Sequence, residues 1–265
     1  MALSAGVSRA RARDDLAWKV EETCRNAWPG LHYVHLGGWL VRLGTGFTRR
    51  GNSASPLASG LDHLLPLIPE VRALFAVRRR PAIFRVPTLL PPRLDAHLDG
   101  LGFTSEGETC VLYGAAEDVP AAPDPEIRLE PAPSREWLAA MSRLQGHDRH
   151  QRAAYARIAA RIAIPAAFAS LAVAGEIVAL AYGAVHRGLL CYESVVTDPR
   201  RRRSGYARRI LAALADWGES RGVAAFCLEV EAANLAARAL YDRFGLATEL
   251  YRYHYRREPK QQRAL

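Results

Sequence analysis

Short apolar runs and helical spacing alternate through the second half of the chain. Two apolar, strand-like runs lie at 168–173 and 177–185, and a third strand is predicted at 189–196. A stretch with a 3.6-residue apolar period follows them and predicts a helix that ends before Gly222. The apolar face of this helix consists of Ala207, Ile210, Leu211, Leu214 and Trp217.

The other segments of this half complete a mixed α/β layer. The remaining predicted elements are a strand at 127–129, helices at 134–144 and 152–162, a strand at 226–230, a helix from 234 and a strand at 250–255. Asn234 can cap the last helix and Gly245 can end it. The order β-α-α-β-β-β-α-β-α-β predicts helices packed around one mixed sheet.

The first half is less regular. Its predicted elements are a helix at 14–27, a hairpin of strands 32–36 and 39–43, a helix at 69–77, a strand at 82–86, a helix at 92–101 and a strand at 109–113. The helix-glycine-aromatic ending at 98–103 is similar to residues 240–246, which suggests a diverged internal duplication.

A composition break separates the two halves. Residues 115–126 read AAEDVPAAPDPE, which is rich in proline, alanine and acid and has no apolar period. Such a stretch is typical of an interdomain linker. We therefore predict one domain at 1–120 and a second at 121–265.

Composition favours a self-sufficient globular protein. The 265 residues are 49% hydrophobic and 24% charged, enough to bury a core. No apolar stretch approaches the roughly 20 residues that span a bilayer, and no apolar segment of a secretory signal follows the basic start. We expect a cytoplasmic protein without a membrane partner.

The net charge of +9 is carried almost wholly by arginine, since Lys19 and Lys260 are the only lysines. This bias is typical of a GC-rich coding genome, although a basic protein also attracts anions. The four cysteines Cys24, Cys110, Cys191 and Cys227 are widely spaced and form no CxxC pair. They predict reduced, buried thiols and no metal site.

The segment 195–208 carries the candidate chemistry. A strand ends near Thr197, Pro199 turns the chain, and small residues open the next helix. The start of a helix presents unpaired backbone N–H groups and the positive end of the helix dipole, a site suited to pyrophosphate. Gly205 permits close approach because it has no side chain. The alternative is an ordinary strand-turn-helix with a solvated arginine run.

Two motifs in this half resemble the GNAT superfamily of N-acetyltransferases. Residues 202–207, Arg-Arg-Ser-Gly-Tyr-Ala, match its R/Q-x-x-G-x-G/A signature, and no Walker or Rossmann spacing is present. Residues 228–246 resemble its second signature, V-x-x-x-N-x-x-A-x-x-L-Y-x-x-x-G-F, with Leu246 in place of the usual aromatic. The match covers roughly 127–257. The first half resembles the degenerate amino-terminal half of tandem GNAT proteins, without a phosphate-loop signature of its own.

The resemblance implies a fold and a set of ligand contacts. The fold is two tandem GNAT-like domains, of which the C-terminal one is a complete acyl-CoA N-acyltransferase fold. The residues implied to hold acetyl-CoA are Val195, Val196 and Thr197 for the pantetheine arm, Arg202, Arg203, Ser204, Gly205, Tyr206, Ala207 and Arg208 for the pyrophosphate, and Asn234 beside the pantetheine. Asn234 can equally be a simple helix cap.

Candidate catalytic residues follow from the same motifs. Tyr241 could protonate the leaving thiolate, or it could be a core tyrosine on its helix's apolar face. Glu193 matches a position where many family members carry a glutamate and is the candidate general base. Glu229 and Glu231, on the neighbouring strand, are rivals. His147 lies in a short polar segment that has no third metal ligand and reads as a solvated turn.

The resulting hypothesis is an N-acetyltransferase that moves an acetyl group from acetyl-CoA to a primary amine by direct attack in a ternary complex. The acceptor would be a small-molecule or peptide amine, the protein a monomer or homodimer, and no metal is expected. One alternative is a non-catalytic acyl-CoA sensor. Another is a basic nucleic-acid-binding protein, to which the aromatic-basic alternation at 251–256 could contribute. We expect no nucleic-acid partner, because the same alternation suits an edge strand.

Overall fold

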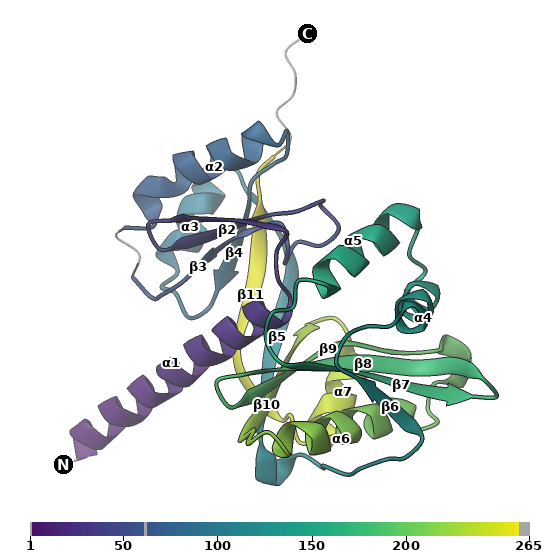
Figure 1. The fold of residues 1–265 in the computed structure, drawn as a ribbon. Helices are drawn as coiled ribbons and strands as arrows, with labels where there is room; N and C mark the ends of the chain where they lie inside the picture. The colour runs from purple at the N-terminus through teal and green to yellow at the C-terminus, as the bar shows by residue number, and fades with distance from the viewer. Residues whose placement is uncertain (1, 61–62, 260–265) are drawn as a thin grey trace.

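The computed structural model describes residues 2–60 and 63–259, which form one mixed β-sheet with helices packed on both faces (Figure 1). The helices are α1 (Ala2–Ala27), α2 (Ile68–Val77), α3 (Arg93–Gly100), α4 (Arg135–Gln145), α5 (Arg149–Ala159), α6 (Tyr206–Glu219) and α7 (Leu235–Arg243). The strands are β1 (His32–Leu36), β2 (Trp39–Leu43), β3 (Ala54–Pro56), β4 (Ile83–Pro87), β5 (Thr104–Ala115), β6 (Ile127–Glu130), β7 (Ala166–Val173), β8 (Glu176–His186), β9 (Leu189–Thr197), β10 (Ala225–Glu231) and β11 (Thr248–Arg257).

The sheet order reveals a repeated arrangement. The strands run β1-β2-β3-β4-β11-β5-β10-β9-β8-β7-β6, and neighbours are antiparallel except β3 with β4 and β9 with β10. Each parallel pair leads through a helix to a further strand, β4-α3-β5 in one half and β10-α7-β11 in the other. These last strands are exchanged, since β5 pairs with β10 and β11 pairs with β4. The arrangement agrees with the expected tandem GNAT fold.

The predicted boundary between residues 120 and 121 falls in the connection from β5 to β6. Backbone hydrogen bonds cross it in space, because β11 lies between β4 and β5 and joins the two parts of the molecule in Figure 1. Asp124 in this connection forms an ion pair with Arg209 of α6, 2.7 Å apart. The division into two domains stays a prediction.

Three apolar clusters hold the layers together. One lies between the sheet and α1, α4 and α5, a second lies under α6 and α7, and a third fills the first half beneath α2 and α3. In α6 the predicted apolar face is confirmed, with Ile210, Leu211 and Leu214 fully buried. Burial of such side chains contributes about 1.5–3 kcal/mol each.

The predicted elements of the second half are confirmed, and Ser134 and Asn234 cap their helices through side-chain oxygens. Helix α5 begins before the predicted residue 152 because Asp148 and Gln151 form a capping box, and it ends at Ala159 rather than at the predicted residue 162. The three-residue strand β3 was not predicted. The expectation that 251–256 is an edge strand is wrong, since β11 has partners on both sides and its alternate tyrosines face the core.

Candidate active site

A cleft opens where β9 and β10 separate. Their parallel pairing runs only from Leu189 to Cys191 on β9, after which the strands diverge. Ser194 has a φ of 57°, and the pairing of β9 with β8 shifts register beside it, so β9 bulges at this point. The space between the strands is a cavity of about 250 Å³, which we call the acyl cleft.

The acyl cleft gathers residues that the sequence motifs had singled out. Glu193, Val195, Asn234 and Tyr241 all line it. Val196 and Thr197 continue β9 beyond the cleft and pair with β8. The acyl cleft is also lined by one residue from the first half, Arg50.

The loop after β9 presents free backbone donors. The side chain of Asp198 accepts a hydrogen bond from the Arg200 amide and shapes the turn at Pro199. In the part of the chain that the structure describes, the amides of residues 202–208 donate to no protein acceptor. Gly205 has a φ of 78°, and nothing lies within 4 Å of the place where a Cβ would stand. The N-terminus of α6 therefore offers open, unpaired donors to an anion.

Arg202, Arg203, Ser204 and Arg208 of this loop are exposed, and Arg203 adopts a φ of 68°. Together with Gly205, two residues of the loop thus have left-handed backbone. Such a conformation is costly for a non-glycine residue and is found where surrounding structure imposes it, often at ligand sites.

Tyr241 lies on α7 and is 8% exposed. Burial, and then the nearby negative charge of Glu193, raise the pKa of its hydroxyl to about 12. The phenol is therefore protonated at neutral pH. It makes no hydrogen bond to the protein among the described residues, so its proton is available to a group in the acyl cleft.

The pKa values of the two buried carboxylates at the cleft are shifted in opposite directions. Burial raises the pKa of Glu193, which is 3% exposed, and Arg50 opposes this only in part. Burial also disfavours ionised Glu229, but attraction to Arg85 and then to Arg50 outweighs it and lowers its pKa to about 2. Glu193 is accordingly the better proton acceptor of the two, and Glu229 is a fixed charge.

An ionic network connects this site to the first half. Arg50 Nη1 contacts Glu193 and lies 3.1 Å from Glu229, while Arg85 Nη2 lies 2.6 Å from both Glu229 and Glu21. Tyr251 donates its hydroxyl proton to Glu21. Buried charges persist in proteins when they are paired and hydrogen-bonded in this way.

A larger cavity of about 560 Å³ adjoins the acyl cleft. Arg50, Glu229 and Glu231 line both spaces. Its other walls come from the loop after β2, the turn before β4, and strands β5 and β11. Sequence reasoning did not identify Arg50 or this cavity, because the lining residues are scattered over the chain.

The polar segment at 147–150 has a structural role. Asp148 caps α5, and His147 packs against the rings of Phe47 and Tyr155 at 5.3 and 5.7 Å between centroids. Burial lowers the pKa of His147. The segment thus joins α5 to the loop after β2.

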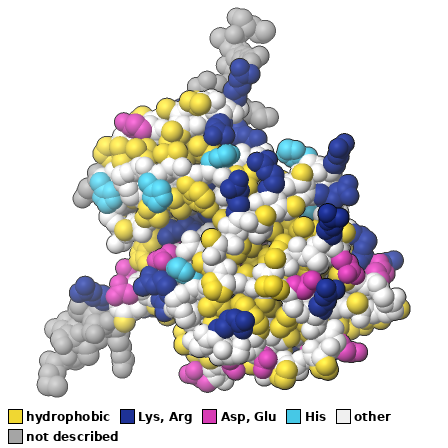
Figure 2. Space-filling model, viewed as in Figure 1, with side chains coloured by type: hydrophobic (Ala, Val, Ile, Leu, Met, Phe, Trp, Pro, Cys, Tyr) yellow, Lys and Arg dark blue, Asp and Glu magenta, His cyan; other side chains and the backbone are white. Residues whose placement is uncertain are grey.

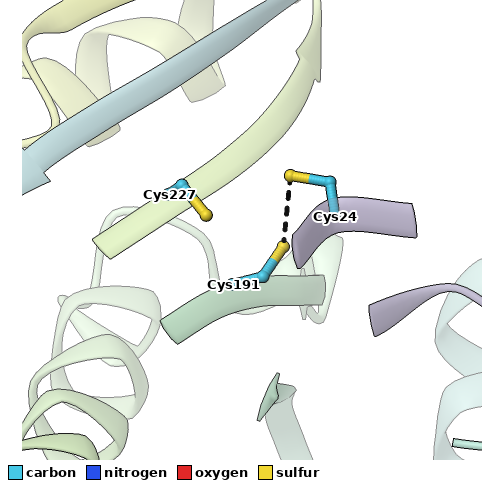
Figure 3. Close-up of side chains that lie close together, drawn as sticks. All are labelled: Cys24, Cys191 and Cys227. Carbon is cyan, nitrogen blue, oxygen red and sulfur yellow. Dashed lines mark hydrogen bonds between the residues drawn. The ribbon is translucent and has the colours of Figure 1, made fainter. Parts of the chain in front are cut away.

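Three of the four free cysteines meet in the core, as Figure 3 shows. The Sγ atoms of Cys24, Cys191 and Cys227 lie within 4.8 Å of one another, and those of Cys24 and Cys191 are 3.7 Å apart. Contact with a neighbouring thiol, and burial besides, raise the pKa of Cys24 and Cys191 well above the usual value. The three side chains pack between α1 and the last paired residues of β9 and β10.

No helix in the described residues is long and apolar enough to cross a membrane.

The chain is similar to known acetyltransferases. Residues 17–256 match the protein family described as "Probable histone acetyltransferase Rv0428c C-terminal". The uncharacterized N-acetyltransferase YobR of Bacillus subtilis (strain 168) is 24% identical over 247 residues, which cover 92% of this chain and 98% of YobR. The ribosomal protein bS18-alanine N-acetyltransferase of Escherichia coli (strain K12) is 42% identical over 62 residues, 23% of this chain and 42% of that enzyme.

Solved structures share the fold. A GCN5-related N-acetyltransferase from Kribbella flavida superposes with a TM-score of 0.65 at 17% identity, covering 96% of this chain and 97% of that one. A tandem GNAT protein from the clavulanic acid biosynthesis pathway gives a TM-score of 0.60 at 10% identity, with 77% and 74% covered. The chain therefore belongs to the family described as probable histone acetyltransferase Rv0428c C-terminal and is a GNAT N-acetyltransferase.

Proposed function

We propose that the protein transfers an acetyl group from acetyl-CoA to a primary amine by direct attack in a ternary complex. The observation that carries this proposal is the set of unpaired amides at 202–208, which stand at the end of β9 beyond the acyl cleft. A diphosphate on these amides would leave the pantetheine arm free to follow the separated edge of β9 towards Glu193 and Tyr241.

The residues of the loop fit this ligand. The amides of residues 203–208 and the positive end of α6 would hold the pyrophosphate, with the exposed guanidinium groups of Arg202, Arg203 and Arg208 supplying further charge. Val195, Val196 and Thr197 would hold the pantetheine arm through backbone groups turned away from β8. Asn234 lines the same cleft, although its side-chain oxygen already accepts from the Ala237 amide.

Two proton transfers are assigned to side chains in the acyl cleft. Acetyl-CoA supplies a thioester whose C–S bond breaks as the new C–N bond forms. Glu193 would accept a proton from the attacking amine, directly or through one water, and its raised pKa makes it the stronger base beside Glu229. Tyr241 would give its phenolic proton to the departing sulfur, since it is fully protonated at neutral pH.

Direct attack suits the residues that line the cleft. None of the four cysteines lines it, and three of them lie in the core with protonated thiols. An acyl-enzyme intermediate on cysteine would need an accessible thiolate. The kinetics should consequently show sequential rather than ping-pong behaviour.

Calorimetry with acetyl-CoA and with desulfo-CoA tests the binding step, and release of the CoA thiol in the presence of a broad amine panel tests the transfer. We expect saturable binding and amine-dependent thiol release. Binding without amine-dependent release would favour the acyl-CoA sensor. Absence of binding would overturn the proposal altogether.

A further inference from the structure

The larger cavity is the candidate binding site for the acceptor amine. It is lined by no residue of α7, whereas Tyr241 of that helix lines the acyl cleft. Its volume of about 560 Å³ is in the range of small-molecule sites. Its contact with the acyl cleft through Arg50, Glu229 and Glu231 would bring an amine to the thioester.

The inner end of this cavity is acidic but neutralised. Glu229 is ion-paired to Arg50 and Arg85, and Glu193 behind it is paired to Arg50. These carboxylates can accept hydrogen bonds from an amine, yet they add little net negative charge. The inner end therefore offers no strong attraction to a multiply cationic ligand.

The outer walls are basic and incompletely paired. Arg80 donates to the Thr45 carbonyl oxygen at 2.6 Å and has no carboxylate partner in the described chain. Arg49 has one ionic contact, a long 3.4 Å approach to Glu231, whose side chain is 68% exposed. Arg257 completes this wall and pairs with Glu106. The guanidinium groups of Arg49 and Arg80 thus keep N–H groups that are free to donate hydrogen bonds to a ligand.

Basic side chains also surround this approach. Figure 2 shows basic side chains over the loop after β2 and over α5, where the sequence has arginine and no lysine. On α5, Arg149, Arg152 and Arg157 form no ion pair with the described residues, and Phe47 of the cavity packs against His147 beside that helix. A lysine-rich peptide would meet repulsion along this route, whereas an anion would be attracted.

We propose that the acceptor is a small primary amine with an anionic oxyacid group, a carboxylate or a phosphate, which Arg49 and Arg80 bind in the larger cavity. The inference rests on the proposed function. The amine end would lie at Glu193 and the anion at the outer wall. Guanidinium forks match both oxyanions in geometry, so the shared chemistry of the ligand is its terminal oxyanion.

A matched series of acceptors tests this assignment. Linear primary amines of three and of six carbons are compared with a carboxylate, a phosphate, a hydroxyl or a second amine at the far end, together with a lysine-rich peptide. Thiol release at saturating acetyl-CoA gives kcat/KM for each. We expect at least one oxyanion class to exceed the hydroxyl compounds by about tenfold or more, the range of one or two charge-assisted hydrogen bonds.

Variants locate the effect. Arg80→Gln and Arg49→Gln should each reduce the preference for the oxyanion over the hydroxyl compound about tenfold, chiefly through KM. Arg78→Gln is the matched control, an exposed arginine of the same turn that does not line the cavity. It should change nothing.

Three results would overturn the inference. The first is equal or better use of the hydroxyl, diamine or peptide acceptors, and the second is an equal effect of the variants on every acceptor. The third is no turnover of the series and no calorimetric binding of its anionic members to the CoA-loaded protein. If acetyl-CoA still binds and any other amine of the broad panel supports thiol release, only this inference has failed. Lost acetyl-CoA binding, or binding without thiol release for any amine, would instead mark a failure of the proposed function.

Discussion

Arg50 Nη1 forms an ion pair with Glu193 Oε1, a contact between residues 143 positions apart in the chain. Arg50 stands in the loop between β2 and β3, stacked 4.5 Å from the centre of the Trp28 ring, whereas Glu193 belongs to β9. Burial raises the pKa of Glu193 and the guanidinium lowers it. The first half of the molecule therefore sets the basicity of the carboxylate that the acyl cleft presents.

Arg50→Gln should move the acid limb of the kcat/KM profile to higher pH. Glu193 acts as a base only when ionised, so activity is lost as pH falls through its pKa. Removing the guanidinium leaves burial unopposed, and the pKa rises further. Initial rates between pH 5 and 9 at subsaturating amine measure the shift.

Glu193→Gln should lower kcat by about 10²-fold or more and remove that acid limb, since a general base contributes roughly 10²–10⁴-fold. Glu231→Gln is the comparison, because this glutamate also lines the cleft but is largely exposed. If Glu231→Gln abolished the limb and Glu193→Gln kept it, the two assignments would have to be exchanged.

Glu229→Gln should destabilise the fold rather than tune the chemistry. It breaks ion pairs to Arg50 and Arg85 and leaves Arg85, which is buried, with Glu21 as its remaining carboxylate. Loss of one partner of a buried pair costs about 3–5 kcal/mol. Urea unfolding at pH 7 measures the loss.

The same variant predicts a pH signature. The pKa of Glu229 is about 2 in the folded chain, below the ordinary 4.5, so its stabilisation is present above pH 4.5 and declines as pH falls towards 2. The stability difference between wild type and Glu229→Gln should shrink over that window. Glu136→Gln, at a 63% exposed carboxylate 3.8 Å from Arg128, should change stability by less than about 1 kcal/mol at any pH.

Tyr241→Phe should reduce kcat by about 10²-fold while the Kd of acetyl-CoA stays the same, because the ring still packs and only the proton is removed. Tyr113→Phe, at a half-buried tyrosine of β5 outside the acyl cleft, is the control. The acid role fails if kcat is retained by Tyr241→Phe across the pH range. Because the hydroxyl pKa is about 12, the phenol stays protonated between pH 5 and 9, so the loss of kcat should be about the same at every pH in that range.

Local signals explain how much of the fold could be predicted. The capping residues of α4 and α7, Ser134 and Asn234, lie within a few residues of the apolar face of each helix, so both helices could be predicted from local sequence. The strand β3 has three residues, too few to show a period. The position of β11 between β4 and β5 depends on partners more than 100 residues away, and no local pattern specifies it. Its alternating buried tyrosines were the one available signal that it is central.

The same division applies to the candidate site. Residues 202–208 and 234–241 lie in continuous motifs, so their grouping around β9 and β10 could be anticipated. Arg50, Arg85 and Glu21 come from three separate segments of the first half. Arg50 and Arg85 meet Glu229, and Glu21 meets Arg85, only after folding. Ion pairs between residues so far apart in the chain produce no local pattern, so a single sequence does not predict them.

Gly205→Glu should abolish acetyl-CoA binding. The added carboxylate would enter the open space beside the unpaired amides, where it would exclude and repel a diphosphate. The substitution also forces a left-handed φ of 78° on a residue with a Cβ, which costs about 1 kcal/mol or more. Binding therefore has to be compared with a variant that carries the same strain.

Gly175→Glu provides that comparison. Gly175 also has a φ of 78° and nothing within 4 Å of its added Cβ, but it lies in the turn between β7 and β8, outside the lining of the acyl cleft. Both variants should lose a similar amount of stability in thermal unfolding, and only Gly205→Glu should lose affinity for CoA in calorimetry. Equal affinity in the two variants would mean that the diphosphate does not sit on the amides of α6, and the placement of the acetyl donor along β9 would have to be abandoned with it.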